Sequence, residues 1–240
     1  FLVASLTGFE RAGHLAGLPL PGGAAAIRQP WRMAAAYLDA AYPGGMPAGL
    51  DVAQRNERRW DNVVSMARRG INSPVTSSAG RLFDAAATIL GVRDLISYEG
   101  QAAIELEQLA DPAETRAYPA SIVPAAGPGP FQVTGADLIR AVADDLGAGT
   151  SPAIIAARFH HGVASMIVAA AELLRDQHGL GTVALSGGVF QNLLLLAAAV
   201  SGLETAGFRV LTHSQVPCND GGISFGQAAV AAAVDNPVPA

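Results

Sequence analysis

Gly181-Thr-Val-Ala-Leu-Ser-Gly-Gly-Val-Phe-Gln-Asn192 and His213-Ser-Gln-Val-Pro-Cys-Asn-Asp-Gly-Gly222 are the two stretches that decide the fold. In the first, residues 182–185 form an apolar run of strand length, a Ser-Gly-Gly turn follows, and residues 189–205 have the apolar density of a helix. The second has the same order, with a strand over 208–212, a loop over 217–222 and an Ala-rich helix over 223–234. Two successive strand-loop-helix units predict a parallel strand pair with crossover helices.

These units predict a crevice suited to a phosphate or a nucleotide. A helix that begins just after a glycine turn points unpaired N–H groups toward the carboxyl ends of the strands. Gly187 and Gly188 lack the Cβ atoms that would block a close approach. Asp220 belongs to the same crevice, and a carboxylate beside a phosphate needs a cation between them, so Asp220 is a candidate metal ligand. An ordinary tight turn explains the paired glycines equally well.

Composition limits the classes of function. Half of the 240 residues are hydrophobic, enough for one large domain or two lobes. All fifteen basic residues are Arg, which excludes a lysine nucleophile, a Schiff base or a P-loop lysine within these residues. The net charge of -5 argues against a nucleic-acid partner. A single cysteine, Cys218, allows no internal disulfide and fits a reducing, cytoplasmic compartment. We rate Cys218 as a packing residue.

The rest of the chain alternates helices with short strands. No uninterrupted apolar run reaches membrane length, so no membrane partner is expected. The sequence begins at Phe1 without Met or a signal peptide, which suggests a fragment of a longer protein. A hairpin is predicted over 1–18 and a strand over 131–134. Helices are predicted over 24–41 (kinked or started by Pro30), 51–69, 79–90, 98–110, 135–146 and 152–178.

Two polar features lie within these helices. Gly80 and Asp84 are four residues apart and share one face, where a close neighbour of Gly80 is expected. Asp84 is flanked by apolar residues and needs a partner, either ribose hydroxyls or a backbone cap. His160 and His161 are adjacent and do not face one metal from a single helix face, so we interpret them as packing or capping residues.

Five segments carry a resemblance to a known family. Together they resemble the HypF carbamoyltransferases of NiFe-hydrogenase maturation, from Phe1 to about Ala233, and match only the carboxyl-terminal part of that family's chain. The segments are Ala26-Ile-Arg-Gln-Pro-Trp-Arg-Met33, Asn72-Ser-Pro-Val-Thr-Ser-Ser-Ala-Gly-Arg-Leu-Phe-Asp84, Ser97-Tyr-Glu-Gly-Gln-Ala-Ala103, Leu185-Ser-Gly-Gly-Val-Phe-Gln-Asn192 and Cys218-Asn-Asp-Gly-Gly-Ile-Ser-Phe-Gly-Gln227.

The resemblance implies a fold and a domain organisation. The matching domain is related to the universal tRNA threonylcarbamoyladenosine enzymes and has an α/β, actin-like fold of the sugar-kinase and heat-shock ATPase class. Here that fold is expected to be partial, with an inserted helical region. The amino-terminal strands are expected over 1–23, a mainly helical insertion with a nucleotide-facing helix over 24–116, and the second lobe over 117–240.

The resemblance also implies a reaction. In the family this domain takes carbamoyl-adenylate, made from carbamoyl phosphate and ATP in a neighbouring domain. It passes the carbamoyl group to the carboxyl-terminal cysteine thiol of the partner HypE. The thiocarboxamide that results is later dehydrated to supply the cyanide ligands of the hydrogenase iron.

Roles for individual residues follow from the same resemblance. It matches Asp220 to a metal-binding aspartate, with iron or zinc left open, and it assigns no catalytic residue. Nucleotide binding is implied for Gly80, Asp84, Gly187, Gly188, Asn192, Gly221 and Gly222. The family's two histidines four apart would precede Phe1, and no His-x-x-x-His occurs in the sequence. We therefore expect weak metal binding and no activity from this fragment alone.

The sequence leaves three other functions as alternatives. A small-molecule O-carbamoyltransferase of antibiotic biosynthesis shares the glycine turn and the metal aspartate, but residues 26–33 and 97–103 fit the HypF family better. A tRNA-modifying enzyme is disfavoured by the acidic charge. A non-catalytic docking module is the alternative from another class, and it would show no rise in melting temperature with ATP or AMP.

Overall fold

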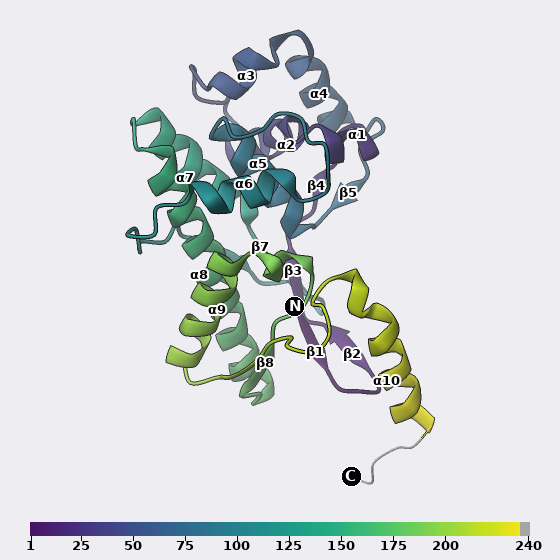
Figure 1. Ribbon diagram of the computed structural model, residues 1–240. Helices are drawn as coiled ribbons and strands as arrows, with labels where there is room; N and C mark the ends of the chain where they lie inside the picture. Colours follow the sequence, from purple (N-terminus) through teal and green to yellow (C-terminus); the bar gives the residue numbers. More distant parts are fainter. Residues whose placement is uncertain (236–240) are drawn as a thin grey trace.

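The computed structural model describes residues 1–235, and the first half of the chain is mainly helical (Figure 1). Two predicted helices are each divided into two. Pro30 is the N-cap of α2, because a proline has no N–H group to continue the preceding helix, and Asn56 separates α3 from α4. The helices of this region are α1 (Ala24–Arg28), α2 (Trp31–Ala41), α3 (Asp51–Arg55), α4 (Glu57–Arg69), α5 (Ala79–Ile89) and α6 (Gln101–Leu109).

Short strands tie the helical region together. The predicted amino-terminal hairpin is present as β1 (Leu2–Ala4) and β2 (Phe9–Arg11), which pair antiparallel. The next strand, β3 (Gly13–Leu15), runs parallel to the distant β7 (Phe131–Val133). The remaining strands of this part are β6 (Ile122–Val123), antiparallel to β7, and the antiparallel pair β4 (Leu18–Pro19) and β5 (Val75–Thr76).

The core lies where α2 and α5 meet α7 (Gly135–Gly147) and α8 (Pro152–His178). Close helix packing explains the glycine within α8, since a Cβ atom at Gly162 would lie 2.8 Å from Leu138 and from the Tyr118 carbonyl. The largest fully buried side chains include Met33, Leu38, Phe83, Leu138, Ile155 and Phe159.

Helix α8 has the length and hydropathy of a membrane-spanning helix, the single such case among residues 1–235. In this fold 61% of its most apolar window is buried inside the protein. It packs against α7 and α9, as a core helix does.

The carboxyl-terminal third contains both predicted strand-loop-helix units. The strands β8 (Thr182–Ala184) and β9 (Arg209–Leu211) pair in parallel, and the crossover helix α9 (Leu193–Thr205) packs along α8. This confirms the predicted parallel pair. The helix expected from residue 189 begins instead as a 3-10 turn, η1 (Gly188–Gln191), and α9 starts after it. In the second unit η2 (Asp220–Gly222) precedes α10 (Ile223–Asp235).

Figure 1 shows helix α10 away from the helical core, and of the elements in the fold it contacts mainly η2. None of its described residues is buried, and the Phe225 side chain is 64% exposed. Other apolar side chains on α10 are exposed as well, namely Ile223, Val230 and Val234. The predicted domain limits at 23 and 116 stay a prediction.

Candidate functional site

The two glycine loops meet at the carboxyl ends of β8 and β9. The Gly187 N–H donates a hydrogen bond of 2.8 Å to the Cys218 carbonyl. A Cβ atom built on Gly188 would lie 3.9 Å from the Asn219 Cβ. The structure therefore brings the predicted Gly187-Gly188 turn beside the loop that holds Asp220, Gly221 and Gly222.

Two of these glycines are required by the backbone. Gly187 has φ 102° and ψ 155°, a conformation that is essentially limited to glycine. A Cβ atom at Gly222 would lie 2.5 Å from the Pro217 carbonyl oxygen, too close for any other residue. Both loops therefore depend on glycine for their shape as well as for access.

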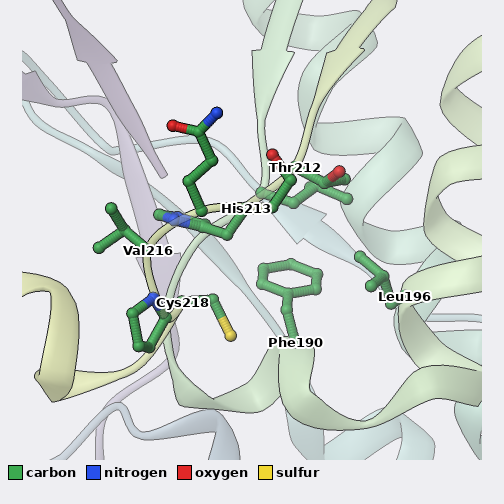
Figure 2. Close-up of a pocket in the computed structure, with 10 residues that line it drawn as sticks. Phe190, Leu196, Thr212, His213, Val216 and Cys218 are labelled. Atoms are coloured by element: carbon green, nitrogen blue, oxygen red, sulfur yellow. The ribbon is translucent and has the colours of Figure 1, made fainter.

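A cavity of about 300 Å³ lies next to the loops (Figure 2). Figure 2 shows the sulfur of Cys218 on the side nearer to the Phe190 side chain. The His213 Nε2 atom lies 2.9 Å from the Ser186 hydroxyl, which joins the two loops a second time. The wall of the cavity combines apolar and polar side chains and consists of Leu185, Phe190, Leu196, Thr212, His213, Ser214, Gln215, Val216, Pro217 and Cys218.

The unpaired N–H groups expected after the glycine turn lie in η1 and not at the N-terminus of α9. The N–H groups of Leu193 and Leu194 donate to Glu107 Oε1 at 2.7 and 3.1 Å. Glu107 belongs to α6, 86 residues earlier, which is why sequence patterns missed it. Among the described residues, the N–H groups of Gly188 and Val189 at the start of η1 have no acceptor. These two donors are available to bind an anion.

Asn192 has an internal structural role at this site. Its side-chain oxygen accepts the Leu195 N–H at 2.8 Å and so caps α9. Its amide nitrogen lies 2.9 Å from His160 Nε2. The side chain is buried, and its role in nucleotide binding stays a prediction.

His160 is buried in α8 between aromatic side chains, in agreement with its interpretation as a packing residue. The rings of Phe83 and Phe159 lie edge-on to it, with centroids 5.3 and 5.9 Å away. The His160 Nδ1 atom lies 2.7 Å from the Ala156 carbonyl. Burial lowers the pKa of His160 to about 4, so the ring is neutral at pH 7. The neighbouring His161 contacts the Glu114 carbonyl through Nε2 at 3.0 Å.

Asp84 is paired with Arg81, a partner that the sequence analysis did not name, and its contact with ribose hydroxyls stays a prediction. Its Oδ2 atom lies 2.8 Å from Arg81 Nη1, one helical turn earlier, and the Asp84 side chain is 1% exposed. The contact is electrostatic, since neither atom makes a directional hydrogen bond. Burial raises the pKa of Asp84 to about 6; Arg81 opposes this shift and Glu99 adds to it.

Gly80, on the same helix, has open space beside it. The one atom within 4 Å of a Cβ built there, outside its own helix backbone and its chain neighbours, is the Ser78 hydroxyl at 3.6 Å. Among the described residues no helix packs closely against Gly80, and a ligand as its close neighbour stays a prediction. Gly80 and Asp84 connect to the glycine loops indirectly, through Phe83 and His160. Their contact with a nucleoside stays a prediction.

Asp220 does not form a metal site with the residues present. Its side chain is exposed at the start of η2. Within residues 1–235 there is no group of three or more His, Cys, Asp or Glu side chains placed to hold a metal ion. One carboxylate supplies one ligand, whereas metals in proteins take four or more. The metal role of Asp220 stays a prediction.

Comparison with known proteins gives relatives over nearly the whole chain. A family model described as the second subdomain of the Kae1-like domain of a carbamoyltransferase matches residues 1–227. A carbamoyltransferase HypF homolog of Cupriavidus necator is 42% identical over an alignment of 234 residues, and the match covers 92% of this chain and 57% of the relative. The carbamoyltransferase HypF of Rhodobacter capsulatus is 40% identical, and the match covers 97% of this chain and 29% of that protein.

Solved structures agree in fold. Full-length HypF in a phosphate- and nucleotide-bound form has a TM-score of 0.87 at 37% identity, covering 98% of this chain and 30% of that one. HypF of T. kodakarensis has a TM-score of 0.78 at 27% identity, covering 96% of this chain and 31% of that one. These likenesses confirm the α/β, actin-like fold. The chain thus spans between about a third and about three fifths of the relatives named here.

Proposed function

Because the chain belongs to the HypF carbamoyltransferase family, we propose that it forms the part of such an enzyme that binds carbamoyl-adenylate and transfers its carbamoyl group. The donor would be made from carbamoyl phosphate and ATP, and the acceptor would be the carboxyl-terminal cysteine thiol of HypE. The product would serve cyanide ligand synthesis in NiFe-hydrogenase maturation, in the cytoplasm.

One observation carries this proposal. The loops after β8 and β9 are joined by the Gly187–Cys218 hydrogen bond and lie beside a cavity of about 300 Å³. The N–H groups of Gly188 and Val189 have no acceptor within the protein, so they can donate to an anion such as the phosphate of an adenylate. The phosphate- and nucleotide-bound state of the solved HypF relative supports the same assignment.

The proposed step is a displacement at a carbonyl carbon. The acceptor sulfur bonds to the carbamoyl carbon, the bond from that carbon to the phosphate oxygen breaks, and AMP leaves with the electron pair. The thiol proton passes to solvent. The adenylate is needed because nitrogen donates into a carbamoyl carbonyl and makes it a poor electrophile. This chain contributes backbone donors that hold the leaving phosphate.

The partners proposed are HypE and the small molecule carbamoyl phosphate. A nucleic acid is not among them, since the net charge is -5 and the charged side chains amount to 15% of the residues.

The test compares two glycine substitutions in the complete gene product that contains these residues. Gly187→Ala and Gly207→Ala both replace a glycine of positive φ, at 102° and 85°, with open space for the new Cβ. Carbamoylation of a HypE-type carboxyl-terminal thiol is followed by its mass shift, with AMP release measured in parallel. We expect Gly187→Ala to lower transfer at least tenfold and Gly207→Ala to leave it within twofold. Wild-type transfer by Gly187→Ala would exclude the glycine loop as the site.

A further inference from the structure

A buried chain of hydrogen bonds ends at the glycine turn. It starts at the Ala156 carbonyl in α8, passes through both ring nitrogens of His160 and both polar atoms of the Asn192 side chain, and ends at the Leu195 N–H in α9. The distances along it are 2.7, 2.9 and 2.8 Å. His160 and Asn192 are 32 residues apart, so this contact is tertiary.

The backbone groups at the two ends of this hydrogen-bond chain determine which atom donates and which accepts in each of its bonds. Leu195 N–H is a donor, so the Asn192 atom facing it is the oxygen, and the atom facing His160 is the NH₂ group. The His160 Nε2 atom must then accept, which leaves the proton on Nδ1, where the Ala156 carbonyl accepts it. A protonated ring would set an N–H against an N–H. The lowered pKa of His160 agrees with this neutral form.

Asn192 is also the residue that ends the 3-10 turn. Its own N–H donates to the Val189 carbonyl at 3.2 Å, and the Phe190 N–H donates to the Gly187 carbonyl at 3.1 Å. The free N–H groups of Gly188 and Val189 lie at the opposite end of this same turn. A change in the position of Asn192 therefore moves the donors that would hold a phosphate.

From this geometry we infer that His160 is a positioning residue for the nucleotide turn, acting through Asn192. Its neutral ring holds the Asn192 amide, and the amide holds η1 and the first turn of α9. The inference rests on the proposed nucleotide site, and goes beyond it by assigning a buried α8 side chain to the organisation of that site. Through the Phe83 ring, His160 also links α5, which carries Gly80 and Asp84, to the same turn.

Two substitutions of His160 separate positioning from packing. In His160→Gln the side-chain oxygen occupies the place of Nε2 and still accepts from Asn192, while the bond to Ala156 is lost. In His160→Asn the shorter amide still donates to Ala156, but it does not reach Asn192. Both variants put a neutral amide in the same buried site, so each serves as the control for the other.

The experiment uses the complete gene product and hydrogen–deuterium exchange of the peptide that covers residues 186–197, without nucleotide and during an ATP titration. Loss of the Asn192 contact removes a buried hydrogen bond, so we expect His160→Asn to weaken the ATP-dependent protection about tenfold in apparent Kd. His160→Gln should stay within about threefold of wild type. Equal loss in the two variants, or no loss in either, would overturn the positioning role.

A separate readout keeps this inference distinct from the proposed function. Without nucleotide, the Leu195 N–H should exchange faster in His160→Asn than in His160→Gln. If ATP fails to protect the peptide in wild type and in both variants, the proposed nucleotide site is refuted. The positioning of the turn is then decided by the Leu195 exchange alone, and identical exchange in both variants refutes it.

Discussion

Glu107 holds the first turn of α9 through Leu193: its Oε1 atom accepts the Leu193 N–H at 2.7 Å and the next N–H, of Leu194, at 3.1 Å. A carboxylate at a helix N-terminus satisfies unpaired donors and is stabilised by the helix dipole. Since α6 belongs to the helical region and α9 to the carboxyl-terminal third, this contact joins the two halves of the chain. It also means that an anion binding near this helix has to use the preceding turn.

Replacement of Glu107 should therefore destabilise the fold. We expect Glu107→Ala to lower the free energy of unfolding by about 1–2 kcal/mol, as loss of a helix cap does, and Glu107→Gln to cost less because its amide oxygen still accepts. Urea denaturation measures both. The matched control is Glu204→Ala, a change of an exposed glutamate near the C-terminal end of α9, which should have little effect. Equal effects of the changes at 107 and 204 would contradict the capping role.

His160 makes stability depend on pH. The folded pKa of His160 is about 4, below the ordinary value of 6.5, because burial disfavours the charged ring. As the pH falls from 6.5 toward 4, the unfolded chain binds the proton first, so the folded state loses stability. This loss should amount to on the order of 3 kcal/mol in wild type and be absent from His160→Gln. Denaturation at pH 7 and pH 4.5 measures it, and parallel losses in the two proteins would refute it.

Asp84 should act in the opposite direction. Its folded pKa of about 6 lies above the ordinary value of 3.8, so between these values the folded state binds more protons than the unfolded chain. Wild type should therefore gain stability relative to Asp84→Asn as the pH falls from 6 to 4, by on the order of 2–3 kcal/mol. Chemical denaturation across this range tests the sign. Asp61→Asn, at an exposed aspartate of α4, provides the control, and a similar pH dependence there would remove Asp84 as the cause.

The second loop depends on Gly222. In Gly222→Ala the new Cβ would meet the Pro217 carbonyl oxygen at 2.5 Å, so the loop must shift. We expect a loss of about 1–3 kcal/mol in unfolding free energy. Gly226→Ala, four residues later in α10 with no atom within 4 Å of the new Cβ, should instead be neutral or stabilise by up to about 1 kcal/mol. Thermal unfolding compares the two, and equal shifts in Tm would show that Gly222 is not sterically required.

Local signals predicted much of the fold. Helix α8 was predicted over 152–178 from the proline at its start and the apolar run, and it has those limits. The β8–β9 pair also followed from local strand and glycine patterns, because parallel pairing is the common outcome of two such units. The division at Asn56 has no comparable signal, since no proline or glycine stands there.

The candidate site was less accessible from sequence, because its decisive contacts are tertiary. Asn192 was assigned to the nucleotide turn by resemblance, but its bond to His160 joins residues 32 apart. Glu107 lies 86 residues from the N–H it caps, and nothing in the pattern of α6 distinguishes it from Glu105, which pairs with Arg93 instead. The apolar flanks of Asp84 indicate that it needs a partner, and the i,i+3 spacing of Arg81 and Asp84 is a sequence signal that could have identified this partner.

The position of Cys218 offers a practical tool. It is the one thiol among these 240 residues, and its sulfur lies on the side nearer to the Phe190 side chain at the cavity wall (Figure 2). A small environment-sensitive dye attached to this sulfur would sit within the cavity and change its emission when the neighbouring loops change shape. Although no chemical role is assigned to this sulfur, it can therefore serve as the attachment point for an optical sensor of the loops.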